Sequence, residues 1–129
     1  MRTLHWRGLW LAIGFAIASI VIYVCLKPGG LSASWIPRSD KLNHAIAYLA
    51  LAGWFGSLLS QRAWLWLAAA LLVFGGAIEL AQDAMPFGRS AEWADMLANL
   101  VGIAMGLICA HWFGAGLLAR LDRTLPRRY

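Results

Sequence analysis

Four long apolar segments, each close to the length that crosses a bilayer, take up most of this chain of 129 residues. They run over about residues 9–26, 41–59, 63–83 and 91–113, and short polar or Pro- and Gly-containing breaks separate them. A membrane-spanning helix needs roughly 20 apolar residues. The chain is 61% hydrophobic and 13% charged, whereas soluble domains carry about 25% charged residues. We therefore predict one all-α domain over the whole chain, a membrane-embedded four-helix bundle.

The basic residues indicate how this bundle is oriented. Seven of them flank one end of the spans: Arg2, Arg7, Arg62, Arg120, Arg123, Arg127 and Arg128. Four flank the other end: Lys27, Arg38, Lys41 and Arg89. The side richer in Lys and Arg is usually cytoplasmic. We therefore expect a multi-pass protein of the cell inner (cytoplasmic) membrane with both termini in the cytoplasm. Because the basic residues lie at the ends of apolar segments, the net charge of +5 does not indicate a nucleic-acid partner.

Polar residues gather in the outward halves of three predicted helices. The set is Asp40, Lys41, Asn43, His44, Tyr48, Glu79, Gln82, Asp83, Glu92, Asp95 and Asn99. Residues three or four apart share a helix face, so His44 lies with Tyr48 and Asp95 with Asn99. An ionised group at the centre of a spanning helix costs about 3 kcal/mol on insertion scales. We therefore expect these faces to meet in a pocket that opens to the extracytoplasmic side.

Each of these residues also has a purely structural interpretation. Asp40 is a candidate helix cap, and the long side chain of Lys41 can reach the interface. Tyr48 is a candidate packing residue, and Asp83 and Glu92 lie at helix ends where water reaches them. The residues inside the spans could also form a buried network that only holds the helices together.

Small residues on the fourth segment suggest how the helices pack. Gly102 and Gly106 form a GxxxG motif, which lets helix backbones approach closely in lipid. The motif fits contacts within the chain, and it equally fits a homo-oligomer through Gly102 and Gly106.

The polar residues also form an ordered pattern along the chain. It consists of Asp40-Lys41-x-x-His44 with Tyr48, then Glu79-x-x-Gln82, Arg89, and Asp95-x-x-x-Asn99-x-x-Gly102-x-x-x-Gly106. Over about residues 40–106 this resembles the VanZ-like family of small bacterial membrane proteins. Members often carry Phe after the His, where this chain has Ala45, and the segment 90–94 is more acidic than is usual for them. The resemblance implies a role in the cell envelope and a link to glycopeptide resistance, whereas the family's biochemical activity is unsettled.

The pocket is compatible with several functions. As a binding module it would hold the headgroup of an envelope lipid or lipid-linked precursor. The residues expected to contact that headgroup are Asp40, Lys41, Tyr48, Gln82, Arg89 and Asn99. As an enzyme acting on a phospholipid or polyprenyl-linked headgroup, it would use His44 with Glu79 or Asp95 as acid and base groups.

Two further alternatives stay open. Transport is less favoured, because the inward halves of the spans carry no polar continuation, and a structural or partner subunit would leave the network incidental. His44, Asp40, Glu79 and Asp95 are chemically suitable metal ligands. However, the chain has no HExxH or CxxC spacing, so we expect no metal and no other cofactor.

Overall fold

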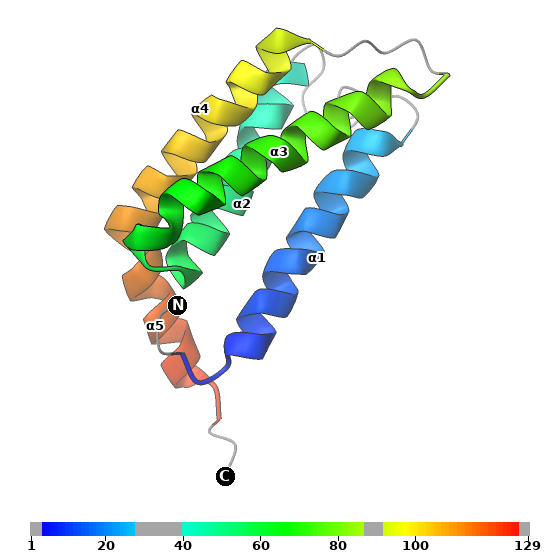
Figure 1. Ribbon diagram of the computed structural model, residues 1–129. Helices are drawn as coiled ribbons and strands as arrows, with labels where there is room; N and C mark the ends of the chain where they lie inside the picture. Colours follow the sequence, from blue (N-terminus) through cyan, green and yellow to red (C-terminus); the bar gives the residue numbers. More distant parts are fainter. Residues whose placement is uncertain (1–3, 28–39, 87–91, 127–129) are drawn as a thin grey trace.

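The computed structural model describes residues 4–27, 40–86 and 92–126, and this part of the chain is all-α (Figure 1). The helices are α1 (Arg7–Leu26), α2 (Asp40–Leu58), α3 (Trp64–Asp83), α4 (Trp93–Cys109) and the short α5 (Ala115–Thr124). A 3-10 turn, η2 (Gln61–Ala63), leads into α3, and a π-helical segment, η3 (Ala110–Gly114), joins α4 to α5. The prediction of an all-α chain with four main helices is confirmed.

Three helical stretches of the described chain are long and apolar enough to cross a membrane. They are Arg7–Leu26, Gln61–Asp83 and Trp93–Thr124. At 1.5 Å per residue, a helix of 20 residues extends about 30 Å, the thickness of the hydrocarbon core. By length and composition these stretches are candidate membrane spans, and they indicate a multi-pass membrane protein. That α2 forms a fourth span stays a prediction, because its first turns carry Asp40, Lys41, Asn43 and His44.

Helix α2 lies against α1, α3 and α4, and its closest partner is α4. A Cβ atom added at Gly102 would collide with the carbonyl oxygen of Ala45, and one at Gly106 would lie 2.8 Å from the backbone nitrogen of Gly53. The GxxxG stripe of α4 therefore packs on α2 of the same chain. The homo-oligomer through these glycines stays a prediction.

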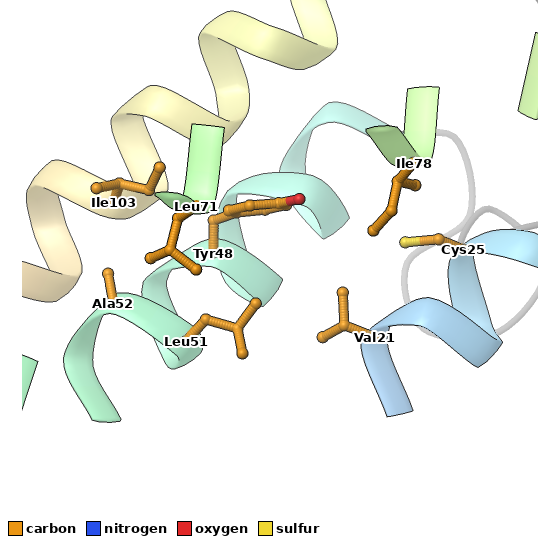
Figure 2. Packing of buried hydrophobic residues seen from close by; sticks show 8 residues of the cluster. All are labelled: Val21, Cys25, Tyr48, Leu51, Ala52, Leu71, Ile78 and Ile103. Atoms are coloured by element: carbon orange, nitrogen blue, oxygen red, sulfur yellow. The ribbon is translucent and has the colours of Figure 1, made fainter. Parts of the chain in front are cut away.

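The apolar core lies between these four helices. Figure 2 shows its buried members, Val21, Cys25, Tyr48, Leu51, Ala52, Leu71, Ile78 and Ile103. Large apolar side chains also cover the outside of the bundle, including Phe15, Tyr23 and Val73, which are 62%, 72% and 74% exposed. Extensive exposed apolar surface marks contact with lipid or with a partner, and lipid is the natural solvent for a surface distributed over all the long helices.

The C-terminal segment, for which the sequence allows an interfacial helix or disorder, forms α5 up to Thr124. Asp122 on this helix is buried, and its carboxylate accepts hydrogen bonds from the backbone N–H groups of His5 (2.8 Å) and Trp6 (3.0 Å). It also accepts one from Nε1 of Trp10 at 2.8 Å. The carboxylate thereby satisfies backbone donors just ahead of α1, which a helix start leaves without partners inside the helix.

Candidate functional site

A cluster of buried polar side chains lies where α2, α3 and α4 meet. Helix α2 contributes His44 and Tyr48, α3 contributes Glu79, and α4 contributes Asp95 and Asn99. Each of these five residues is 5% exposed or less. The polar faces expected from helical spacing therefore do turn inward, and we call this group the polar cluster.

His44 is oriented by Asn99. Its Nδ1 atom lies 3.1 Å from Oδ1 of Asn99. An amide oxygen can only accept a hydrogen bond, so Nδ1 carries the proton and donates it. In the neutral imidazole the other nitrogen, Nε2, then presents a lone pair. Among the described atoms Nε2 has no hydrogen-bond partner, and the nearest carboxylate oxygen, Oε1 of Glu79, is 3.8 Å away.

Three residues of the polar cluster have the chemistry and the proximity to hold a metal ion. One ligand atom each from His44, Glu79 and Asp95 lie within 4.8 Å of one another, and all three residues are buried. The sequence spacing predicts no such group, since the three residues come from three helices. Only the packing of the bundle brings them to one point.

Tyr48 and Asn99 lie side by side beneath the backbone of α3. A Cβ atom added at Gly75 would stand 2.7 Å from Nδ2 of Asn99 and 2.9 Å from the hydroxyl of Tyr48. Gly75 therefore provides the space that both polar groups occupy. The hydroxyl of Tyr48 is buried and has no hydrogen-bond partner among the described atoms.

Lys41 joins the polar cluster to the surface. Its ammonium group donates a hydrogen bond of 2.9 Å to Oε2 of Glu92 and lies 3.7 Å from Oδ1 of Asp95. Lys41 and Glu92 are about half exposed, at 53% and 52%, whereas the side chain of Asp95 is 7% exposed. The hydrogen bond and the charge of Lys41 hold the pKa of Glu92 below its ordinary value of 4.5. This contact ties the start of α2 to the start of α4.

The structure separates one predicted site residue from the others. Gln82 is buried, but its Nε2 donates a hydrogen bond of 2.8 Å to the backbone carbonyl of Cys25. It therefore connects α3 to the last turn of α1 instead of reaching His44. Asp40 begins α2, and its side chain lies outside the described part, as does all of Arg89.

A groove of about 380 Å³ opens next to the polar cluster, between α3 and α4. Its lining is Gly76, Glu79, Leu80, Glu92, Trp93 and Met96. Glu79 belongs to both the groove and the polar cluster, so it connects the two. Neither Trp93 nor Met96 stands out in the sequence as a candidate for this role. The i, i+3 spacing of Trp93 and Met96 places them on one face, but only the neighbouring α3 turns that face into a groove.

The described residues thus form a helical protein with candidate membrane spans and a buried His/Glu/Asp cluster. No family model, curated protein or solved structure matches the chain.

Proposed function

We propose that this chain is a multi-pass protein of a bacterial inner membrane that binds the headgroup of an envelope lipid or lipid-linked precursor. The observation that carries the proposal is the groove between α3 and α4, which shares Glu79 with the polar cluster. An amphiphilic ligand has an apolar stem and a polar head. The groove offers apolar surface from Leu80, Trp93 and Met96 and carboxylates from Glu79 and Glu92.

The charges around the groove favour a particular kind of headgroup. The positive charge of Lys41 is already engaged by Glu92 and Asp95. Phosphate would have to compete with two carboxylates for that ammonium group. Amines and sugar hydroxyls donate hydrogen bonds, and carboxylates such as those of Glu79 and Glu92 on the groove wall accept them. Within the described residues, the groove therefore suits an amine- or hydroxyl-bearing headgroup better than a bare phosphate.

The placement in the membrane is part of the proposal. Helix α2 would form the fourth span, since it is enclosed by α1, α3 and α4, with Leu51 and Ala52 fully buried. The Lys and Arg distribution supports a topology with both termini in the cytoplasm, in which the groove would lie at the extracytoplasmic face. The resemblance to VanZ-like proteins adds the cell envelope as the context, with glycopeptide resistance as a role to be tested.

Native mass spectrometry of the purified, delipidated protein tests the proposal. Phosphatidylethanolamine, phosphatidylglycerol and undecaprenyl phosphate would be added one at a time. We expect phosphatidylethanolamine to be retained best, and we expect Trp93→Ala and Glu79→Gln to lose it. Asp83→Asn, which changes an exposed carboxylate at the end of the same helix, should retain it. Equal retention in all three folded variants would overturn the proposal.

A membrane enzyme is the second candidate, and the hydrogen bond between His44 and Asn99 favours it. This bond leaves Nε2 of His44 as an oriented proton acceptor, with Glu79 3.8 Å away. An enzyme would cut or transfer the bound headgroup. Thin-layer chromatography of radiolabelled lipid would then show a product with the unmodified protein and none with His44→Ala. Loss of fold in His44→Ala, Glu79→Gln and Asp95→Asn alike would favour a purely structural network.

A further inference from the structure

The continuous helical stretch Trp93–Thr124 is longer than a bilayer requires. Its 32 residues extend about 48 Å at 1.5 Å per residue, whereas the hydrocarbon core is about 30 Å thick. Two exposed tryptophans on this stretch, Trp93 and Trp112, lie 19 residues apart, a separation of about 28 Å. Tryptophan concentrates at the two interfaces of a membrane. Trp93 and Trp112 therefore fit the two interfaces, and α5, which follows Trp112, lies at the edge of the bilayer.

At this edge α5 leaves a strip of apolar side chains uncovered. Its inner side is fixed to the bundle by Asp122 and Leu118. Leu117 and Leu121 are four residues apart, which places them on one face of the helix, and they are 59% and 43% exposed. In water this strip would stay wetted. An amphipathic helix at a membrane interface buries such a strip at the boundary between headgroups and acyl chains.

Two arginines lie beside the apolar strip. Arg120 and Arg123 are exposed, and their i, i+3 spacing places them on one face of α5. Arg120 is also three residues from Leu117, so the basic and apolar faces adjoin. Among the described residues, neither guanidinium group forms an ion pair. Both groups can therefore meet an anion from outside the described part of the chain.

The charge at this end of the bundle is predominantly positive. Of the six acidic residues in the sequence, only Asp122 follows Asp95, and its carboxylate is engaged by donors at the start of α1. Arg7 begins α1 and Arg62 lies in η2, both at the same end of the bundle as α5 and both exposed (Figure 1). The surface around α5 is therefore complementary to an anionic partner.

From this arrangement we infer that α5 binds anionic phospholipids of the adjacent leaflet. Leu117 and Leu121 pack against the acyl chains, and Arg120 and Arg123 bind the phosphate group. A guanidinium group presents paired N–H donors that match two phosphate oxygens. Clustered basic residues beside a membrane span attract anionic lipid. The inference does not rest on the headgroup proposal, because the groove is lined by Trp93 at the opposite end of the same helical stretch.

Native mass spectrometry of the delipidated protein tests the inference with two lipids that share their acyl chains. Dioleoyl phosphatidic acid is anionic, and its bare phosphate is the headgroup that the groove disfavours. Dioleoyl phosphatidylcholine has no net charge and serves as the comparison. We expect phosphatidic acid to bind more tightly, and its affinity to fall about fivefold for each arginine removed in Arg120→Gln/Arg123→Gln. A higher concentration of ammonium acetate should weaken this binding, because salt screens exposed charges.

Two further variants separate the parts of the site. Arg120→Lys/Arg123→Lys keeps both charges and should retain most of the affinity for phosphatidic acid. Leu117→Ser/Leu121→Ser keeps the arginines, removes the apolar strip and should weaken binding. Circular dichroism checks that each variant stays helical. Phosphatidic acid bound no more tightly than phosphatidylcholine, which would leave α5 to a protein partner, overturns the inference. Unchanged affinity in folded Arg120→Gln/Arg123→Gln overturns it as well.

Trp93→Ala separates this inference from the headgroup proposal. The substitution changes the groove and leaves α5 intact, so it should lose phosphatidylethanolamine and keep phosphatidic acid. Arg120→Gln/Arg123→Gln should do the reverse. Loss of phosphatidic acid in folded Trp93→Ala would contradict the assignment of this lipid to α5.

Discussion

The carboxylate of Asp122 accepts a hydrogen bond of 2.8 Å from the indole nitrogen of Trp10, and thereby joins the two ends of the chain. The same carboxylate accepts the backbone N–H groups of His5 and Trp6. Leu118, one turn earlier on α5, packs with Trp10 and Leu58 in a small apolar cluster. α5 is therefore held by both polar and apolar contacts, at the end of the bundle away from the polar cluster (Figure 1).

Asp122→Ala should destabilise the protein. Removing a buried acceptor leaves its donors unsatisfied, at about 1–3 kcal/mol for each group that water cannot reach. We expect the free energy of unfolding to fall by roughly 2 kcal/mol or more, as measured by denaturation in mixed micelles. Asp83→Ala removes an exposed carboxylate, and it should change the free energy of unfolding by less than about 0.5 kcal/mol. Equal effects of the two substitutions would contradict the role of Asp122.

Gly102→Ala should force α2 and α4 apart. The new methyl group would meet the backbone carbonyl of Ala45, which cannot move aside as a flexible side chain can. Overpacking of this kind costs about 1–3 kcal/mol, and occasionally more. The measurement is the unfolding temperature in detergent.

Gly76→Ala is the matched control for this substitution. Nothing lies within 4 Å of a Cβ atom at Gly76, and Ala is favoured over Gly inside a helix by roughly 0.5–1 kcal/mol. The control should therefore leave the unfolding temperature unchanged or raise it. A Gly102→Ala variant as stable as Gly76→Ala would show that the two helices do not pack at Gly102.

Asn99→Ala should destabilise the protein. The substitution deletes the amide oxygen that accepts a hydrogen bond from Nδ1 of the buried His44, and a buried donor left unsatisfied costs about 1–3 kcal/mol. Denaturation in mixed micelles measures the free energy of unfolding. Ser57→Ala, which removes a hydroxyl bonded to the carbonyl of Gly53 in the same helix, leaves no donor without an acceptor and should cost less than about 1 kcal/mol. A free energy of unfolding that is unchanged in Asn99→Ala would argue against the hydrogen bond to His44.

Lys41→Met should raise the pKa of Glu92 toward its ordinary value of 4.5, because the hydrogen bond and charge of Lys41 lower it. A carboxyl whose pKa is lower in the folded than in the unfolded chain stabilises the fold above the unfolded pKa. That contribution is lost as the pH falls through the folded pKa. The stability difference between the unmodified protein and Glu92→Gln should accordingly be present at neutral pH and vanish in acid. NMR titration of ¹³C-labelled carboxyl groups measures the pKa, and an unchanged value in Lys41→Met would contradict the pairing.

Much of the helical architecture follows from the sequence alone. Apolar runs of about 20 residues, ended by polar or Pro- and Gly-containing breaks, leave few alternatives to spanning helices. The predicted bounds of the first three helices agree with α1, α2 and α3 to within two residues. The spacing of His44 with Tyr48, and of Asp95 with Asn99, also correctly predicts which side chains share a buried face.

Only the tertiary structure decided which neighbouring helix each polar helix face packs against. Helical periodicity relates residues within one helix, but it does not specify which neighbour a face meets. Helical spacing puts Gln82 on the same face as Glu79, yet the side chain of Gln82 donates a hydrogen bond to the backbone carbonyl of Cys25 at the end of α1. In the sequence Asp122 is one of several charged residues near the C-terminus. In the structure it lies on α5 and is buried against the start of α1. The convergence of His44, Glu79 and Asp95 likewise depends on how three helices pack, because close packing between helices, and not local spacing, sets their relative rotation and offset.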